Sequence, residues 1–425
     1  MFFTAEKEYV TAGGIPVYAM PSMHLHSFSL SLYVRGGALF EEDTRAGISH
    51  FIEHLIFRSI NRYMKGTLYE TLDRYGLAVE GVTYREFLQF SITGSPRHYG
   101  IAAEILSYAL SPLNLTAEDI RTERDRIKAE IREEGEKSTL DYFTDRLLFG
   151  ADHPLSRPIT GTAGTLNRMT ASLLASEKAR LFSKENIFFY LSGAFPDDAV
   201  TKLCDLCAHH TPLSLAERVI APRIPDGYFH RDALVACKGG SKTLVRLSFD
   251  VDTARYTDAE LTLLYDILLG DGEGCFFHKA LSEKTGMIYS FRGYMELYRN
   301  IGSLGVTYEI PPSGLIPSLR LAVDAINRTK TDSPSALPFV CAPYIDNAAF
   351  LFDDAQGLSF NRAYERYILR LPYPTLSHRK DAYAAVTGER LSRIAREIFQ
   401  PQNATLTLTS RKADTAALRS ILLGL

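Results

Sequence analysis

Two histidines and a glutamate in the segment 50–54, which reads HFIEH, are the residues best suited to chemistry in this sequence. Positions four apart on a helix lie on one face, so His50 and His54 can direct their imidazoles at the same point. Two neutral imidazoles and one carboxylate form a common catalytic zinc set, in which water takes the fourth position. Glu53 lies between the histidines and could take a proton from that water. The segment therefore predicts one zinc ion per chain with a general base beside it.

The residues that flank this motif are mostly apolar, which predicts a buried helix. Buried histidine and glutamate side chains must be hydrogen-bonded, paired or bound to metal. A single buried histidine is usually a satisfied core residue, but two histidines and a glutamate on one turn favour a metal site. The apolar residues are Phe51, Ile52, Leu55, Ile56 and Phe57.

A charged stretch from Thr116 to about residue 137 is expected to form a helix that supplies the carboxylate ligand. Thr116 with Asp119 three residues later resembles an N-terminal cap. Glu123 and Glu130 are seven residues apart and therefore lie on one face of this helix. Both are candidates for a place at the metal site. The other acidic residues near the end of the stretch should be solvated: Glu133, Glu134 and Glu136.

Three segments together resemble the pitrilysin and mitochondrial processing peptidase family of zinc peptidases. Residues 35–57 read RGGALFEEDTRAGISHFIEHLIF, residues 123–130 read ERDRIKAE, and residues 153–161 read HPLSRPITG. The order H-x-x-E-H is the inverzincin signature. The resemblance implies that zinc is bound by His50, His54 and Glu130. It also implies that Glu53 is the general base and that Glu123 supports the site without binding the metal.

The resemblance further implies a peptide-binding edge strand and a gripping pair in the second half of the chain. The edge strand reads EGVT at 80–83, and its substrate-binding residues would be Glu80, Gly81 and Thr83. Family members usually carry an arginine with a tyrosine seven residues later. Here Tyr289 matches the tyrosine, but Ser282 stands at the arginine position. Serine cannot replace the forked donor of a guanidinium.

From this resemblance we expect a zinc-dependent metalloendopeptidase that cleaves short or unfolded peptides inside a chamber formed by two chains. Processing of leader or precursor peptides is one role that fits. Two explanations fit Ser282: a heterodimer whose partner chain supplies the arginine, which we favour, or a homodimer with a specialised peptide substrate. The alternative class is a non-catalytic structural or peptide-capture subunit, although such relatives usually have a damaged zinc motif.

An internal repeat predicts the domain organisation. Two strands with apolar and polar residues alternating, at 28–34 and 245–251, also match across the two halves. We expect an α+β fold of two tandem similar domains, each an antiparallel-rich β-sheet with helices packed on one face. The domains would be 1–212 with the zinc site, a proline-bearing linker at 213–227, and 228–425 without the metal motif. The repeated residues are Thr170, Leu174, Phe182 and Asn186, which recur at the same spacing as Thr387, Leu391, Phe399 and Asn403.

The composition excludes several other classes of protein. The 425 residues carry a net charge of −3 with both signs dispersed, so neither nucleic acid nor anionic lipid is an expected partner. No apolar run reaches about 18 residues, so we expect no membrane span. The first residues do not resemble a signal peptide, and we expect a cytoplasmic protein. Five cysteines do not suggest a disulfide scaffold, and Cys204 and Cys207 are interpreted as helix core.

Overall fold

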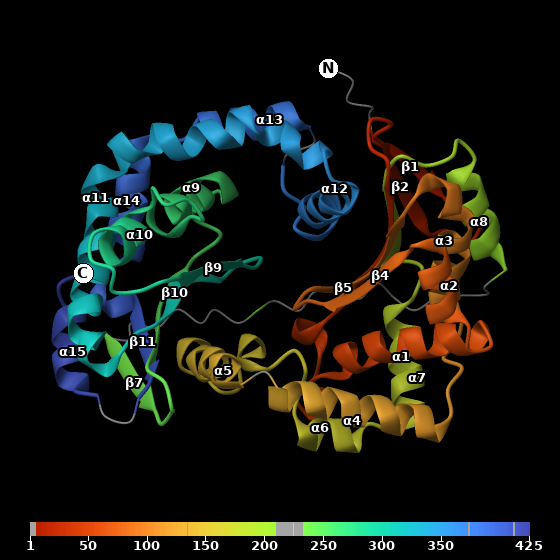
Figure 1. Ribbon diagram of the computed structural model, residues 1–425, viewed down its shortest axis with the longest axis horizontal. Helices are drawn as coiled ribbons and strands as arrows, with labels where there is room; N and C mark the ends of the chain where they lie inside the picture. Colours follow the sequence, from red (N-terminus) through yellow and green to blue (C-terminus); the bar gives the residue numbers. More distant parts are fainter. Residues whose placement is uncertain (1–5, 134, 210–223, 225–232, 373–374, 411–412) are drawn as a thin grey trace. The chain divides into compact units, whose positions relative to one another are not determined.

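The chain forms two compact units, each built around one β-sheet (Figure 1). The computed structural model describes residues 6–133, 135–209, 224, 233–372, 375–410 and 413–425. Unit 1 comprises Met1–Glu133, Arg157–Pro222 and Ala349–Pro372, and unit 2 comprises Glu134–Ser156, Arg223–Ala348 and Tyr373–Leu425. The expected fold class, α+β with two similar antiparallel-rich sheets, is confirmed. The expected boundaries stay a prediction, because the linker at 213–227 lies outside the described residues except for Ile224.

Each unit also contains a segment from the other half of the sequence. Residues 134–156 of the first half belong to unit 2, and residues 349–372 of the second half belong to unit 1. The internal repeat did not indicate this exchange.

Unit 1 contains a six-stranded sheet in the order β1-β2-β6-β3-β5-β4. The β2–β6 pair is parallel, and the other pairs described in this sheet are antiparallel. The edge strand β4 pairs with β5 alone among the described strands. The strand bounds are β1 (Lys7–Val10), β2 (Pro16–Pro21), β3 (Phe28–Arg35), β4 (Ala78–Thr83), β5 (Phe87–Gly94) and β6 (Ile187–Gly193).

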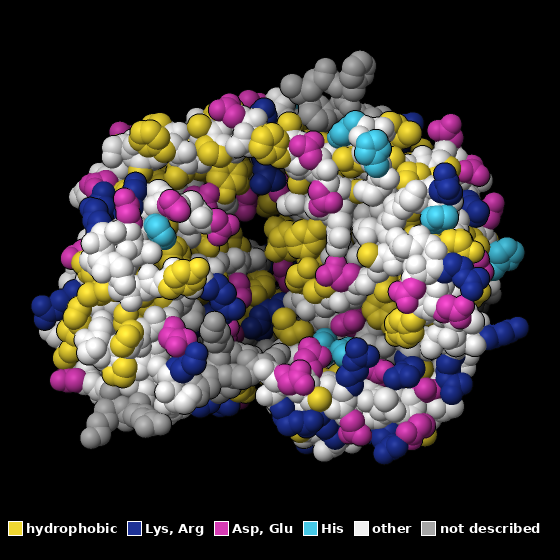
Figure 2. All heavy atoms as spheres, viewed as in Figure 1, with side chains coloured by type: hydrophobic (Ala, Val, Ile, Leu, Met, Phe, Trp, Pro, Cys, Tyr) yellow, Lys and Arg dark blue, Asp and Glu magenta, His cyan; other side chains and the backbone are white. Residues whose placement is uncertain are grey.

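The helices of unit 1 include the predicted metal-site helix and the charged helix after it. The Thr116 cap is confirmed, since the Asp119 amide donates to the Thr116 hydroxyl and the Thr116 amide to the Asp119 carboxylate. Figure 2 shows acidic and basic side chains interspersed over α4 and α6. The α-helices are α1 (Ile48–Tyr63), α2 (Leu68–Tyr75), α3 (Tyr99–Ser107), α4 (Ala117–Glu133), α6 (Ala163–Arg168), α7 (Ala171–Leu181), α8 (Ala199–Ala208) and α12 (Ala355–Arg362). Shorter turns are η1 (Ala38–Phe40), η2 (Asp43–Arg45), η3 (Pro96–His98), η4 (Tyr108–Leu110) and the π-helix η9 (Ala363–Ile368).

Unit 2 repeats this plan with a five-stranded sheet in the order β7-β11-β8-β10-β9. Its strands are β7 (Leu234–Lys238), β8 (Leu244–Val251), β9 (Phe291–Leu297), β10 (Gly302–Glu309) and β11 (Ala404–Thr409). Its α-helices are α5 (Gly135–Phe149), α9 (Asp258–Leu269), α10 (Phe276–His278), α11 (Leu315–Asp346), α13 (Leu376–Ala384), α14 (Gly388–Ile398) and α15 (Thr415–Leu422). Shorter turns are η5 (Pro154–Ser156), the π-helix η6 (Lys279–Glu283), η7 (Pro312–Gly314) and η10 (Pro401–Asn403), and η8 (Ala348–Phe352) follows α11.

The exchanged helices cover the polar faces of the sheets, where the alternation of residues had predicted one covered face only. In unit 1, Ser359 of α12 hydrogen-bonds with the hydroxyls of Tyr33 and Ser31 on β3, at 3.2 and 3.1 Å. In unit 2, the Arg246 guanidinium of β8 donates to Asp141 of α5 at 2.6 Å. Both central strands are consequently buried along almost their whole length. Polar residues on these faces contact helices instead of water.

The internal repeat is confirmed at the level of single hydrogen bonds. Thr170 and Thr387 each cap the helix that follows, α7 and α14. The Asn186 amide donates to the last carbonyls of α7 and to the end of β3. The side-chain amide of Asn403 likewise donates to the carbonyl oxygens of Ile398 in α14 and Asp250 in β8. The same polar side chain therefore ties helix to sheet in both units.

One helical stretch, Pro312–Phe352, is long and apolar enough to cross a membrane by length and composition, with a mean hydropathy of 1.2 over its most apolar window. The expectation of no membrane span stays a prediction, because core helices of globular proteins pass the same test of length and composition. The sequence contains no unbroken apolar run of sufficient length, because small and polar residues interrupt this helical stretch. Residues in the first turns of α11, among them Leu319, Ala322 and Ile326, are buried in the core of unit 2. Of the most apolar window, 11% is buried.

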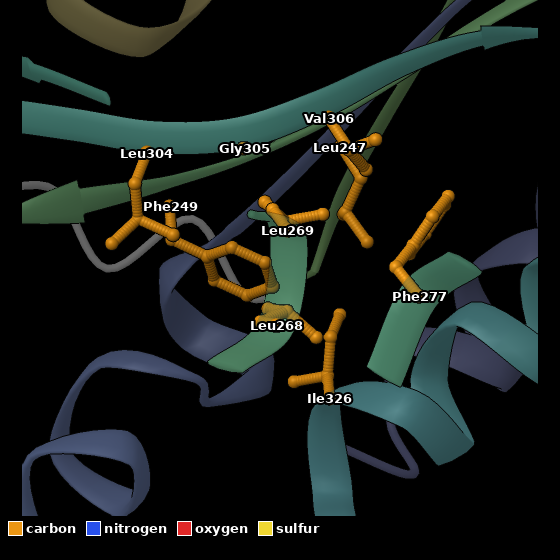
Figure 3. A pocket seen from close by; sticks show the side chains of 9 residues that line it. All are labelled: Leu247, Phe249, Leu268, Leu269, Phe277, Leu304, Gly305, Val306 and Ile326. Atoms are coloured by element: carbon orange, nitrogen blue, oxygen red, sulfur yellow. The ribbon is translucent and has the colours of Figure 1, made fainter. Parts of the chain in front are cut away.

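The core of unit 2 encloses a small apolar cavity of about 10 Å³ between the sheet and α9, α10 and α11 (Figure 3). A cavity needs about this volume to hold a single water molecule, and water also needs polar partners. The cavity is therefore a packing defect and not a substrate site. Its lining residues are Leu247, Phe249, Leu268, Leu269, Phe277, Leu304, Gly305, Val306 and Ile326.

The loop at 157–161 packs backbone to backbone against the start of α1. Gly47, which precedes α1, and Gly161 in the loop have φ angles of 91° and 72°. A Cβ atom on Gly161 would lie 2.3 Å from the Ala46 carbonyl oxygen, and one on Gly47 would lie 2.6 Å from that of Thr160. This close approach fixes the start of the helix that carries the two histidines.

We expect Gly161→Ala to lower the free energy of unfolding by about 3 kcal/mol, because a left-handed alanine and a clash with backbone add together. The matched control is Gly76→Ala, which has a φ of 60° but no atom within 4 Å of the added Cβ, and should cost only about 1 kcal/mol. Both glycines belong to unit 1. Urea unfolding followed by circular dichroism measures the difference. Equal urea midpoints for the two variants would show that the loop at 157–161 accommodates the added methyl group without loss of stability.

Candidate metal centre

A buried carboxylate caps the N-terminus of α1 and thereby orients it. Glu41 accepts hydrogen bonds from the backbone amides of Gly47 and Ser49 at 2.7 and 2.8 Å. These amides lack partners within the helix, and the N-terminal end of a helix favours negative charge. Arg157 donates to the Glu41 carbonyl oxygen at 2.6 Å. The loop and the cap together hold the helix start in one position.

The donor atoms of His50, His54 and Glu130 converge on one point, since all lie within 4.8 Å of one another. The Nε2 atoms of His50 and His54 lie 3.6 and 3.5 Å from the two carboxylate oxygens of Glu130. Ligand atoms about 2.1 Å from a tetrahedral zinc ion are about 3.4 Å apart. The spacing of the donor atoms therefore fits a zinc ion, with His50 buried and Glu130 partly open to solvent.

Glu123 contacts His54 at the ring nitrogen that does not face Glu130. Its carboxylate lies 3.3 Å from His54 Nδ1 and accepts a hydrogen bond from Arg58 Nε at 2.9 Å. A bond from Nδ1–H to a carboxylate leaves Nε2 free to bind a metal and raises the basicity of the ring. The side chain of Glu123 is 4% exposed, and the hydrogen bonds to His54 and Arg58 lower its pKa against the effect of burial. Glu123 therefore stays charged and holds His54 in place.

The imidazoles differ in their affinity for protons. Burial and the neighbouring His54 lower the pKa of His50, so this ring is neutral at neutral pH. Burial lowers the pKa of His54 as well, but hydrogen bonds to Glu123 and Glu130 outweigh it and raise the value to about 9. A cation bound at Nε2 of His54 would release that proton. Among the described residues, Nδ1 of His50 is buried without a hydrogen-bond partner.

Glu53 lies beside the donor set, with its carboxylate 3.8 Å from His50 Nε2. Burial raises the pKa of Glu53 to about 7, whereas the positive charge of His54 acts in the opposite direction. Such a pKa suits a group that must accept a proton and return it near neutral pH. A Cβ atom at Gly81 of β4 would lie 2.5 Å from Glu53 Oε1. Glycine at this position therefore lets the edge strand pass directly over the carboxylate.

The structure brings some of the expected substrate-binding residues to the metal site and leaves others as predictions. Gly81 and the buried Thr83 lie on β4 next to Glu53. Glu80 is exposed, and its carboxylate accepts a hydrogen bond from Gln356 of α12 at 2.6 Å. Tyr289 is fully exposed in unit 2, between η6 and β9, and its role toward substrate stays a prediction.

Three residues of the site were missed by sequence reasoning: Glu41, Arg58 and Arg126. Arg58 could have been found, because it follows His54 by one helical turn and a buried Glu123 needs a positive partner. Arg126 could have been found as well, because it shares a helix face with Glu123 and Glu130. The role of Glu41 depends on how the chain folds back onto the start of α1, which no spacing rule indicates.

An α+β module with two histidines and two glutamates around one metal position is the architecture of a metallopeptidase. Residues 19–163 match the model of the insulinase family, peptidase family M16. An uncharacterized zinc protease of Mycobacterium tuberculosis is 25% identical over 336 residues, which are 77% of this chain and 75% of that protein. The β subunit of the mitochondrial processing peptidase of Lentinula edodes is 23% identical over 205 residues, 48% of this chain and 44% of that subunit. The expected resemblance to this family of zinc peptidases is therefore confirmed, and the family match covers residues 19–163.

Solved structures share the fold at low sequence identity. A protease from Helicobacter pylori has a TM-score of 0.80 at 15% identity, covering 96% of this chain and 100% of that one. A peptidase M16 inactive domain from Pseudomonas fluorescens has a TM-score of 0.82 at 14% identity, with 97% and 100% covered. The periplasmic protease PqqL of Escherichia coli has a TM-score of 0.77 at 15% identity, with 99% of this chain and 50% of that chain covered.

We expect Glu123→Gln to weaken zinc affinity by about 10- to 100-fold, because an amide holds neither His54 nor Arg58 as the carboxylate does. Chelator competition on the purified protein measures the change. Glu118→Gln is the matched control, since Glu118 lies on the same helix, is exposed and pairs with Arg121. Identical affinities for the two variants would show that Glu123 has no influence on the metal site.

Proposed function

We propose that this chain is a zinc-dependent metalloendopeptidase that cleaves short or unfolded peptides, with one zinc ion per chain bound by His50, His54 and Glu130. The observation that carries this proposal is the convergence of these three donors beside Glu53, under an edge strand. A zinc ion there supplies a Lewis acid that polarises the scissile carbonyl and lowers the pKa of the attacking water.

The residues of the chain then carry the proton through the reaction. Glu53 accepts a proton from the attacking water while the water oxygen bonds to the carbonyl carbon. It returns the proton to the amide nitrogen as the carbon–nitrogen bond breaks, so the carboxylate is regenerated. Burial of Glu53 acts to raise the pKa of this carboxyl, which is the direction that favours uptake of the proton from water. Glu123 keeps His54 oriented throughout.

The substrate is proposed to bind as an added strand along β4. This strand pairs with β5 alone among the described strands, and Glu80 at its middle is exposed. Main-chain hydrogen bonds to an edge strand give affinity that depends little on sequence. The close approach of Gly81 to Glu53 would bring the backbone of such a peptide next to the general base.

A second chain is proposed to complete the enzyme. The PqqL chain is about twice as long as the part that this chain matches, and the processing peptidase relative is named as a subunit. Ser282 stands where the family resemblance leads us to expect an arginine. We propose a heterodimer in which the partner supplies that arginine and in which leader or precursor peptides are processed.

Two substitutions separate metal binding from catalysis. We expect His54→Ala to lose most of the zinc and the activity, and Glu53→Gln to keep the zinc but lose at least about 100-fold in kcat, because an amide cannot accept the water proton. His26→Ala, an exposed histidine, is the control and should change neither. Elemental analysis and a fluorogenic peptide library provide the two measurements. Zinc binding without cleavage of any peptide would favour the alternative, a structural or peptide-capture subunit.

The proposed pairing predicts weak activity for the isolated chain. Ser282→Arg should raise kcat/KM severalfold, because a guanidinium can bind a peptide carbonyl or carboxylate at two points. Ser335→Arg, which adds the same charge at an exposed position of α11 in unit 2, should have no effect. A partner chain co-purified from the native host should give a larger gain. Full activity of the isolated chain, unchanged by Ser282→Arg or by a partner, would favour a specialised homodimer.

A further inference from the structure

One charged side chain at the metal centre has no role in binding the metal or moving the proton. Arg126 lies on α4 between Glu123 and Glu130, three residues after the first and four before the second, so all three share a helix face. Its side chain is 68% exposed, whereas that of Glu123 is 4% exposed. The guanidinium therefore lies on the same side of α4 as the donor set but reaches into solvent.

Arg126 has only a weak partner in the described part of the chain. Its Nη1 atom is 4.0 Å from Glu123 Oε2, which is beyond hydrogen-bonding distance. Glu123 is already bound by Arg58 and by His54 at shorter distances. Arg121, an exposed arginine on the same helix, is held by two hydrogen bonds to Glu118. The donors of Arg126 are thus available to a bound molecule.

The positive charge of Arg126 acts electrostatically on Glu53 and Glu130. Burial raises the pKa of Glu53 and the charge of Arg126 opposes that rise. The hydrogen bond to His54 lowers the pKa of Glu130, and the charge of Arg126 acts in the same direction.

Arg58, another cation near the site, is already engaged by Glu123. The edge strand carries the exposed acidic residue Glu80. An acidic side chain of a peptide would be repelled by Glu80 of β4 and attracted by Arg126.

We propose that Arg126 is a specificity-determining residue that binds an aspartate or glutamate side chain of the substrate close to the scissile bond. This inference rests on the proposed peptidase function and adds a substrate class to it, peptides with an acidic residue at one position. The guanidinium offers planar, forked donors that match a carboxylate at two points.

The test uses end-blocked peptides in which one aspartate is moved through successive positions around the cleaved bond, each compared with the asparagine peptide. For the wild-type chain we expect kcat/KM at one position to favour aspartate by about three- to fivefold, as for a partly exposed ion pair. The preference should shrink in 0.5 M salt, because screening weakens such pairs.

Variants assign the preference to the side chain. Arg126→Gln should abolish it and Arg126→Glu should reverse it in favour of lysine, while both keep one zinc per chain. The matched control, Arg121→Gln, removes a similarly exposed arginine from the same helix and should leave the preference intact. An unchanged aspartate preference in Arg126→Gln, or no preference at any position in the wild-type chain, would overturn the inference.

Binding of the same peptides to the Glu53→Gln variant, measured by fluorescence anisotropy, separates this inference from the proposed function. Cleavage without an acidic preference would leave the peptidase and reject the role of Arg126. Binding with the preference, without cleavage by the wild-type chain, would reject the peptidase and keep the acidic site. Absence of both cleavage and binding would overturn both.

Discussion

The metal centre depends on one buried carboxylate, that of Glu123. A carboxylate enclosed between two helices is costly unless it is fully paired, and here His54 and Arg58 of α1 pair it from one side. This contact fixes the rotation and the height of α4 against α1. Glu130, two helical turns further along α4, then lies within reach of both imidazoles. The buried Ile120 and Ile127 of α4 turn the same face of this helix toward the core of unit 1.

The other half of the site depends on close backbone packing. The loop at 157–161 meets the start of α1 at glycines, and Gly81 lets the edge strand pass over Glu53. Side chains at these positions would push the elements apart. Glu53, the two histidines and the edge strand therefore sit on elements whose distances are set by close approaches of backbone. Such an arrangement would hold reacting groups in a fixed geometry.

The two units share one arrangement of helices and sheet, but their corresponding helices carry different kinds of residue. Both tie a capped helix to the sheet through an asparagine, and both receive a helix from the other half of the sequence on the polar face of the sheet. Unit 1 places its histidines and glutamates on α1 and α4. In unit 2, α9 is a mostly buried apolar helix that packs on the core with its small dry cavity.

The sequence by itself predicted the donor groups of the candidate site and determined the class of fold. The spacing of His50, Glu53 and His54 placed three groups on one helix, and the seven-residue spacing of Glu123 and Glu130 placed two carboxylates on another. Periodicity indicated the sheets, and the repeat indicated two similar halves. These features are local, because the face of a helix or strand follows from residue spacing alone.

Only the tertiary structure decided what depends on contacts between elements. It showed that Glu41 caps α1, that Gly81 makes room for Glu53, and that Arg126 stays largely unpaired beside the metal position. It also showed that residues 134–156 and 349–372 join the opposite unit. Sequence spacing cannot reveal these arrangements, because the packing of elements distant in sequence decides which side chains meet and which backbones approach.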